Sequence, residues 1–383
     1  MTSERKGPLA GIRILEVGHM LAGPYCGMLL ADLGAEVIKV EMPGGGDIAR
    51  QIGPHRVGEH NVYFASLNRG KLSVTIDLSS PKGQEEFHGL VTTAHGVLTN
   101  LRPSAIKKYG LDYEGLRSSN PKIACLALTG FGLHGPEADR PAYDYVVQAM
   151  VGVMSLTGEP DGPPGKAGYS VVDNSSGIMG ALGLVAKIHE GKGGQVEVSL
   201  YDTMLSQLNY LAAAYLNAGE KPERRSGGAH PYIVPAQVFP TADGHITIFV
   251  THDRFWAKFA DAAGRLEWME DPRFATMQAR SENRESVVAA VTDVLASRTT
   301  AAWLDILVPL GIVAAGVETM ESALASSLAS GNQMVAAIQT SSGPIRVIGR
   351  AIRTDNDASL APPPLLGEHD EMLLKRQGAA GGY

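Results

Sequence analysis

The chain has 383 residues, 44% of them hydrophobic, which is enough to form the cores of two or three domains. Its formal net charge of −7 at pH 7 argues against a general nucleic-acid or anionic-membrane binder. Two cysteines, Cys26 and Cys125, are too few for a disulfide framework or a cysteine-ligated zinc site. We expect both to be buried in a reducing compartment, and, with no apolar run typical of a signal peptide or membrane span, we expect a cytoplasmic protein.

The first half of the chain alternates between strand and helix patterns. Residues 11–17 predict a buried strand, 23–34 a helix that ends on a glycine, and 35–41 the next strand. Such a βαβ unit has parallel strands. Further strands are predicted at 72–78, 95–100, 123–128 and 194–202, and helices at 80–94 and 178–189. We therefore expect an α/β fold with a doubly wound, Rossmann-like parallel sheet.

The composition changes near residue 220. Residues 219–231 are polar and rich in Gly and Pro, as in a loop or linker. Residues 236–250 predict a hairpin that turns at Asp243-Gly244, and 301–311 predict a helix. We take 226–325 as a smaller α+β domain. Residues 1–225 and 326–383 then form the large domain, to which the tail at 361–376 returns.

Asp173 stands between two valines and the helix predicted at 178–189. Aspartate is disfavoured in strands and in helix interiors. One interpretation is a helix N-cap, a role open also to Asn174 and Ser175. The other is a nucleophile or acid/base group at a strand-to-helix junction. The stretch alone favours the cap.

The common phosphate-binding motifs are absent. GHMLAGP stands where a dinucleotide fold would carry G-x-G-x-x-G, and neither a P-loop nor a G-x-S-x-G elbow occurs. The PGGGD stretch at 43–47 lacks the Lys-Ser/Thr of a phosphate loop and predicts a surface turn.

Several polar residues follow predicted strands, where open α/β sheets bind ligands. His19 follows the first strand, and either a ligand contact or a structural histidine fits there. Arg102, Lys107 and Lys108 follow another; they suit phosphate groups or a solvated helix start. Tyr143 and Asp144, before an amphipathic segment, are more typical of a core aromatic and a cap.

Taken together, these segments resemble the class III CoA-transferases, a family that includes formyl-CoA transferase, carnitine CoA-transferase and α-methylacyl-CoA racemase. The resemblance rests on six segments in order, at 8–41, 68–83, 100–123, 144–164, 173–202 and 362–369. It implies a Rossmann-like large domain built from both chain ends, an inserted smaller domain, and an interlocked homodimer with the active site between domains of different subunits.

By this resemblance Asp173 is the catalytic nucleophile. It attacks the thioester of an acyl-CoA, and a mixed anhydride and then an aspartyl-CoA thioester follow, from which a carboxylate acceptor takes CoA. The implied substrates are an acyl-CoA and a small carboxylic acid. No permanently bound cofactor, metal, nucleic acid or membrane is implied.

The resemblance also assigns contacts to CoA and substrate, at His19, Met20, Leu21, Ile76, Asn100, Leu101, Arg102, Lys108, Tyr109, Ala142, Tyr143, Gly227 and Gly228. Leu21 replaces a glutamine of formyl-CoA transferase, so we expect an acyl group larger than formyl or oxalyl. Lys108 and Met42 stand where relatives often carry arginine. Gly227 and Gly228 fall in a glycine-rich loop that covers the active site in the family, although a plain linker fits the composition as well.

Two alternatives remain. Racemases of the family exchange an α-proton with a His and an Asp, the His in a G-H-D stretch. This chain has Ala142-Tyr143-Asp144, and phenols of pKa about 10 are poor bases at neutral pH. His19 could act instead, which keeps an acyl-CoA racemase or epimerase open.

The second alternative is an inactive CoA-ester-binding protein, against which the intact Asp173 argues. Arg140, Arg224 and Arg225 could pair with an acceptor carboxylate, or be surface charges.

Overall fold

A computed structural model describes residues 6–355, 357 and 359–374, which form two compact units. The first unit runs to Val151, includes Gly168–Ala213 and resumes at Ser327; the second comprises Gly152–Ala167 and Ala214–Ser326. The sequence analysis placed the boundaries at 225/226 and 325/326. Residues 152–167 lie with the second unit because Glu159 and the carbonyls of Gly162 and Pro163 hydrogen-bond to residues 224–227.

The first unit is built on a six-stranded sheet in the order β5-β2-β1-β6-β7-β8, in which every neighbouring pair is parallel. The expected α/β parallel sheet is confirmed. Chain order runs outward from β1 through β2 to β5 on one side and through β6 and β7 to β8 on the other. The direction reverses between β1 and β6, and such switch points are where open α/β sheets bind ligands. The strands are β1 (Arg13–Val17), β2 (Glu36–Glu41), β5 (Leu72–Thr75), β6 (Gly96–Thr99), β7 (Ala124–Thr129) and β8 (Gly194–Ser199).

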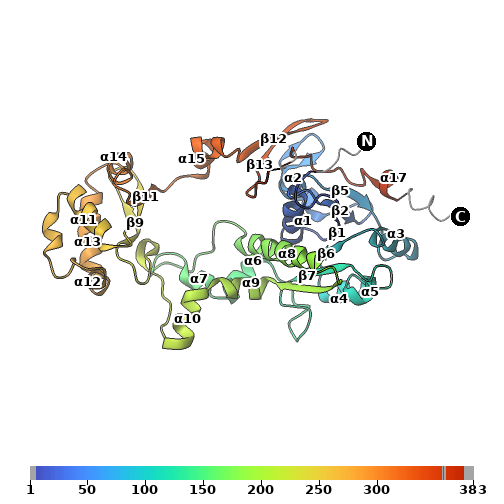
Figure 1. Ribbon diagram of the computed structural model, residues 1–383, viewed down its shortest axis with the longest axis horizontal. Coiled ribbons are helices and arrows are strands. Elements are labelled where there is room, and N and C mark those ends of the chain that lie inside the picture. Colours follow the sequence, from blue (N-terminus) through green and yellow to red (C-terminus); the bar gives the residue numbers. More distant parts are fainter. Residues whose placement is uncertain (1–5, 356, 358, 375–383) are drawn as a thin grey trace. The chain divides into compact units, whose positions relative to one another are not determined.

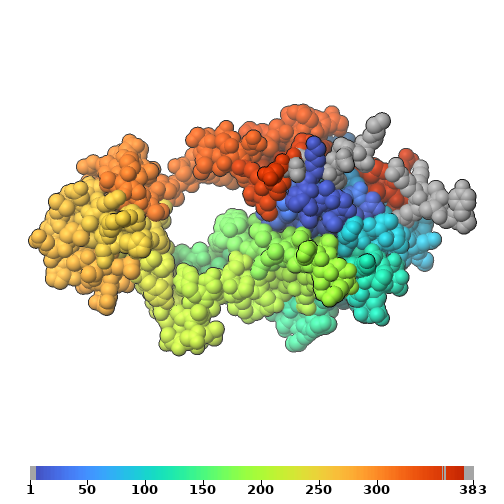
Figure 2. Space-filling view, in the orientation of Figure 1, coloured from blue at the N-terminus to red at the C-terminus, as the bar shows by residue number. Residues whose placement is uncertain are grey.

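Helices cover both faces of this sheet (Figure 1). One face carries α1 (Ala22–Asp32) and α8 (Val171–Glu190), which are in contact with each other in Figure 2. The other face carries α3 (Pro81–Val91), α4 (Pro103–Tyr109) and α5 (Tyr113–Leu116). Side chains of β1 alternate between the two cores, with Ile14 on the α1 side and Leu15 on the α3 side, as strand geometry requires.

Helix α8 begins seven residues earlier than predicted, at Val171 instead of Ile178. Asp173 therefore lies in the first turn of a 20-residue helix, and the predicted strand-to-helix junction is wrong. The early turns pack closely on α1, because a Cβ at Gly177 would lie 3.0 Å from the Ala22 carbonyl oxygen. Packing of these small residues extends the helix beyond its strongly apolar part.

The remaining elements of the first unit surround the sheet. The hairpin of β12 (Val335–Thr340) and β13 (Gly343–Ile348) packs on α2 (Val62–Asn68) around Ala65. The tail returns to the sheet edge as predicted, where Asp370 accepts the Thr75 amide at 2.7 Å. The other elements are η1 (Ile48–Gln51), β3 (Arg56–Val57), β4 (His60–Asn61), α6 (Asp144–Met150), α9 (Leu200–Gln207), α10 (Asn209–Ala218, which enters the second unit), α16 (Ser327–Gly331) and α17 (Asp370–Leu373).

The second unit has its own core, formed by an antiparallel sheet in the order β11-β10-β9 and by helices. The predicted hairpin is present as β9 (Ala236–Pro240) and β10 (His245–Phe249). Its other elements are α7 (Val153–Leu156), η2 (Ser226–Gly228), α11 (Asp253–Ala262), η3 (Leu266–Met269), α12 (Met277–Glu282), α13 (Arg284–Leu295), α14 (Thr300–Leu307), β11 (Val313–Gly316) and α15 (Met320–Ala325).

Within the described residues, no single helix is long and apolar enough to cross a membrane. The bent pair of α13 and α14, at 108°, passes the same test of length and composition when the two are taken together. Its apolar side chains, among them Val291 and Trp303, are buried in the core of the second unit.

Candidate active site

A pocket of about 660 Å³ lies at the carboxyl ends of β1, β6 and β7, within the first unit. It spans the switch point between β1 and β6, because the loops that follow these two strands both line it. Its lining comprises His19, Met20, Leu21, Ala22, Tyr63, Asn100, Leu101, Arg102, Ser104, Ala105, Leu128, Thr129, Gly130, Pro141, Ala142, Tyr143, Asp144, Tyr145, Val146, Ser170, Asp173 and Leu200.

Most of the predicted contacts come together in this pocket. They are His19, Met20, Leu21, Asn100, Leu101, Arg102, Ala142, Tyr143 and Asp173. Ile76, Lys108 and Tyr109 do not line it. Ile76 is buried in the core on the α3 side, while the exposed Lys108 ammonium lies 5.0 Å from the Tyr109 ring centre.

Gly227 and Gly228 belong to the second unit, in η2. Both have positive φ, and Glu159 accepts the Gly227 amide at 2.9 Å. Two of the three arginines considered as acceptor contacts have local partners. Arg140 pairs with Glu137 at 2.9 Å, and Arg224 donates to the Gly162 carbonyl at 2.7 Å.

The Asn100 side chain fixes the loop after β1. Its Oδ1 accepts the His19 amide at 3.0 Å and its Nδ2 donates to the His19 carbonyl at 2.9 Å. This contact requires glycine at position 18, because a Cβ there would lie 2.3 Å from Asn100 Oδ1. The two loops at the switch point are thereby tied together.

A second contact holds the same loop from the β2 side. Asp47 Oδ1 accepts the amides of Met20 at 3.0 Å and Ala49 at 2.9 Å, and Asp47 Oδ2 lies 2.8 Å from Lys39 Nζ. Asp47 is 3% exposed and Lys39 is fully buried. The PGGGD stretch is therefore exposed only at its first three residues; its aspartate turns inward, because Lys39 and the two amides bind it.

Four buried charges lie beneath this loop. Glu16 pairs with Lys39 at 2.8 Å and with Lys71 at 2.7 Å, and Asp47 also pairs with Lys39. The two carboxylates and two ammonium groups balance, which is the condition under which buried charges are tolerated. Burial lowers the pKa of Lys71 to about 8 against the opposing attraction of Glu16, while neighbouring carboxylates raise the pKa of Lys39.

Asp173 is half-buried in the first turn of α8, on the pocket wall. The N-cap position belongs to Ser170, whose side chain makes no capping bond. The carboxylate of Asp144 caps instead, accepting the Val172 amide at 2.9 Å. Asp173 is thus not the N-cap residue; it lies in the first turn of α8, at the helix end that attracts negative charge.

Tyr63 is a pocket residue that the sequence analysis missed. It lies at the start of α2, where Asn61 caps the helix by accepting the Tyr63 amide at 2.8 Å. Burial raises the pKa of its phenol, and the negative charges of Asp173 and Asp47 raise it further. The hydroxyl therefore stays protonated at neutral pH and can donate a hydrogen bond in the pocket. The Asn61 cap was readable in the sequence, but its proximity to Asp173 was not.

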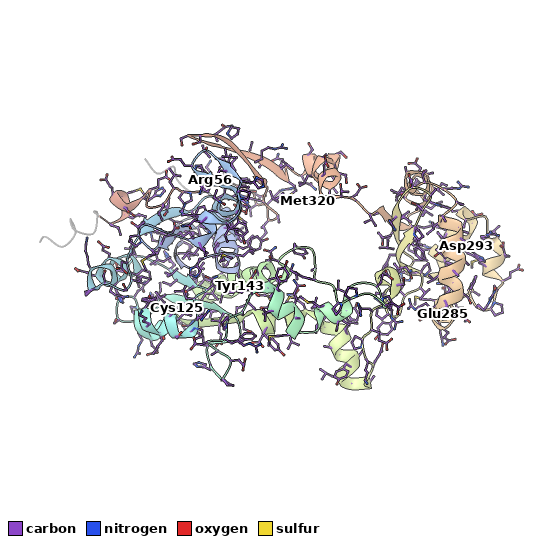
Figure 3. All side chains as sticks on the ribbon, turned by 180° about the vertical axis from the view of Figure 1, so that it is seen from behind. Arg56, Cys125, Tyr143, Glu285, Asp293 and Met320 are labelled. Carbon is purple, nitrogen blue, oxygen red and sulfur yellow. The ribbon has the colours of Figure 1, made fainter. Side chains whose placement is uncertain are left out.

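The remaining polar side chains of the pocket differ in exposure and charge. Partial burial lowers the pKa of the His19 imidazole, Asp47 opposes the shift, and Lys39 adds to it. Tyr143, labelled in Figure 3, is exposed at the N-cap of α6. Ala142 lies close to Gly130, the residue after β7, because a Cβ added to Gly130 would lie 2.4 Å from the Ala142 Cβ. Arg102, exposed at the N-cap of α4, brings a permanent positive charge to the pocket.

Metal-ligand clusters and reactive thiols are not features of this site. The described residues contain no group of three or more His, Cys, Asp or Glu side chains arranged to hold a metal. Cys26 and Cys125 are buried as expected, and burial raises the pKa of both thiols.

Comparison with known proteins finds relatives that cover most of the chain. The model of CoA-transferase family III matches residues 9–370. Succinate–glutarate CoA-transferase of Agrobacterium fabrum is 43% identical over 293 residues, 74% of this chain and 73% of its own length. Succinyl-CoA–D-citramalate CoA-transferase of Chloroflexus aurantiacus is 39% identical over 301 residues, 76% of this chain and 75% of its own. The crystal structure of a CAIB/BAIF family protein from Brucella suis, 34% identical, covers 97% of this chain and 100% of its own with a TM-score of 0.84.

Proposed function

The chain belongs to CoA-transferase family III, and from this membership we propose that it moves CoA from an acyl-CoA donor to a carboxylic acid acceptor with Asp173 as the nucleophile. The two named relatives act on succinate, glutarate and D-citramalate derivatives. We therefore place short dicarboxylic acids first among the donors and acceptors. This choice agrees with the expectation from Leu21 of an acyl group larger than formyl.

The observation that carries the proposal is the position of Asp173. Its carboxylate lines the same pocket as the His19–Leu21 and Asn100–Arg102 loops, which meet at the switch point of the sheet. A carboxylate nucleophile needs to be ionised and poorly solvated. The α8 N-terminus attracts negative charge, and apolar side chains such as Leu21 and Leu128 line the same pocket.

The proposed reaction proceeds by four exchanges at acyl carbons. An Asp173 carboxylate oxygen attacks the thioester carbonyl of the donor, the C–S bond breaks, and a mixed anhydride and CoA thiolate form. The thiolate attacks the aspartyl carbonyl, which releases the donor acid and leaves an aspartyl-CoA thioester. The acceptor carboxylate attacks that thioester and expels the thiolate. The thiolate then attacks the acceptor acyl carbon, giving the new acyl-CoA and restoring Asp173.

Other pocket residues have proposed roles that fit this sequence of steps. Arg102 binds a phosphate of CoA, since a guanidinium suits that group. The protonated Tyr63 hydroxyl donates to the oxyanion that forms at each attack, as a preorganised donor should. Gly227 and Gly228 remain proposed contacts of the bound substrate, and a homodimer remains proposed from the resemblance.

Intact-protein mass spectrometry tests the proposal. The wild-type protein is mixed with succinyl-CoA, glutaryl-CoA and a wider panel of acyl-CoAs, with and without borohydride, beside Asp173→Ala. We expect a CoA adduct that borohydride removes and that the variant lacks. Asp202→Ala, which replaces an acid beside the α9 cap Ser199, serves as the matched control and should keep the adduct.

The alternatives give different results in the same experiment. An acyl-CoA racemase forms no adduct and instead incorporates deuterium at the α-carbon in heavy water. An inactive binding protein retains acyl-CoA without adduct or exchange. Either result would contradict the nucleophilic role of Asp173.

A further inference from the structure

Met20 adopts a left-handed backbone conformation, with φ of +67°, in the middle of the loop that forms one pocket wall. A residue other than glycine is destabilised by about 1 kcal/mol or more in this conformation, so contacts with other residues must stabilise it. The amide of Met20 has such a contact at Asp47 Oδ1, 3.0 Å away.

Asp47 is suited to this contact because both of its oxygens are used. Oδ1 accepts the Met20 and Ala49 amides, while Oδ2 lies 2.8 Å from Lys39 Nζ. Lys39 also donates to the Gly18 carbonyl at 2.9 Å, two residues before Met20. The buried ion pair therefore holds the loop at two points, one through each partner.

We propose that Asp47 is a positioning residue of the pocket: paired with Lys39, its carboxylate fixes the Met20 backbone and thereby the wall formed by His19 to Leu21. Asp47 itself does not line the pocket. It acts through the backbone of Met20 and through its charge near His19. The inference concerns the pocket, and only its kinetic readout rests on the proposed function.

Asp47→Asn separates the carboxylate from an isosteric amide. An amide has one acceptor oxygen, so it can satisfy Lys39 or the Met20 amide but not both. Asp32→Asn is the matched control, because Asp32 is also a largely buried carboxylate in an ion pair: both of its oxygens accept from Arg69, and Oδ1 lies 3.7 Å from Arg350 Nε. Both variants lose a largely buried ion pair, and both should therefore lose thermal stability.

Three readouts distinguish positioning from stability alone. We expect Asp47→Asn to lower kcat for CoA transfer from succinyl-CoA to glutarate by about tenfold or more, since small misplacements at a reacting centre are costly. We expect Asp32→Asn to keep kcat within about twofold of wild type, since Asp32 does not line the pocket. The His19 imidazole, followed by NMR of histidine-labelled protein, should titrate at lower pH in Asp47→Asn only, because Asp47 raises its pKa. The third readout is the melting temperature, in which the two variants should fall together.

In Asp47→Asn, the other charged groups around His19 are the same as in the wild-type protein. The charges that act on His19 are Asp47 and Lys39, and the pocket wall also carries Asp144, Asp173, Arg102 and Tyr63. Only Asp47 changes. Equal kcat in the two variants would overturn the proposal and leave Asp47 a stabilising residue, even if His19 titrates differently, because loss of the Asp47 charge alone changes that titration.

The two proposals fail separately. If the wild-type protein transfers no CoA, the proposed function is wrong, yet the backbone amide NMR shifts of His19 to Leu21, compared between Asp47→Asn and Asp32→Asn, still decide whether Asp47 holds the loop. A second pair, Met20→Gly and Met20→Gly/Asp47→Asn, tests the route through the Met20 backbone, because glycine adopts the left-handed conformation without strain. There the His19 shift should persist while the kcat difference shrinks below about threefold, since the backbone no longer needs to be held. An undiminished kcat loss would contradict action through Met20.

Discussion

The carboxylate of Asp144 accepts the backbone amide of Val172, so one buried acid caps the helix whose first turn carries a second acid, Asp173. The two capping partners are 28 positions apart in the sequence. The other oxygen of Asp144 accepts the Gln148 side-chain amide at 2.7 Å, which orients the carboxylate. The geometry of the proposed nucleophile therefore depends on α6 as well as on its own helix.

Asp144→Ala should reduce both stability and activity. Loss of a helix N-cap costs about 0.5–2 kcal/mol in the free energy of unfolding, and the freed turn displaces Asp173. Urea denaturation and kcat measure the two effects. Asp112→Ala removes a similar cap on α5, where Asp112 accepts the Gly115 amide at a distance of 2.8 Å. Asp112 does not line the pocket, so this variant should reduce stability alone. A normal kcat in Asp144→Ala would show that α8 holds Asp173 without it.

Asn100→Asp should weaken the binding of acyl-CoA. The carboxylate cannot donate to the His19 carbonyl, and its charge adds to those of Asp144 and Asp173 in the pocket. We expect an increase of about tenfold in the Kd of an acyl-CoA, equivalent to one lost charged or paired hydrogen bond. Isothermal titration measures it. Asn120→Asp is the control, since Asn120 also bridges backbone groups, at Val91, Ala94 and Lys122. Equal affinities in both variants would contradict the role of Asn100.

Tyr63→Phe should lower kcat while leaving acyl-CoA affinity nearly unchanged. Removal of a single oxyanion donor lowers kcat by about 10²- to 10³-fold. Because burial and two carboxylates raise the pKa of Tyr63 above its ordinary value of 10.0, the wild type should not lose activity through this group below that pH. A kcat profile from pH 6 to 10 tests both statements. Tyr113→Phe, which loses a bond to the Pro121 carbonyl, should behave as wild type.

Lys71 should make stability rise with pH in the alkaline range. Its pKa is about 8 in the folded protein and 10.5 for an ordinary lysine, so between these values the unfolded chain binds more protons. The free energy of unfolding then increases with pH, by an amount on the order of 1 kcal/mol or more. Urea denaturation at pH 7.5 to 10.5 should show this rise in wild type and in the exposed-site control Lys122→Met. Lys71→Met should lack this rise. Parallel curves for all three proteins would show that Lys71 is not its cause.

Local patterns in the sequence were sufficient for the six strands of the parallel sheet in the first unit and for one hairpin of the second unit. The βαβ start, the strands at β6 and β7 and the hairpin of β9 and β10 all lie where periodicity and turn residues placed them. Element ends were less well determined. β5 stops at Thr75 and β8 at Ser199, short of the predicted 78 and 202, because the ladder partners end there.

The resemblance predicted more residues of the site than composition and local patterns did. It indicated Asp173 and both switch-point loops, which the fold brings into one pocket. It did not separate the residues that line this pocket from those that support it from behind. Ile76 was named beside Leu101, yet it points into the core on the α3 side.

The sequence by itself determined the alternating α/β order, and with it the edge of the sheet where the pocket lies, because both follow from local periodicity and strand direction. Only the tertiary structure decided that Asp144 caps α8, that Asp47 and Lys39 hold the Met20 backbone, and that Tyr63 faces the charge of Asp173. Each of these is a contact between segments far apart in the chain. Such contacts depend on burial and on the pairing of charges, and no local pattern encodes which partner a buried carboxylate finds.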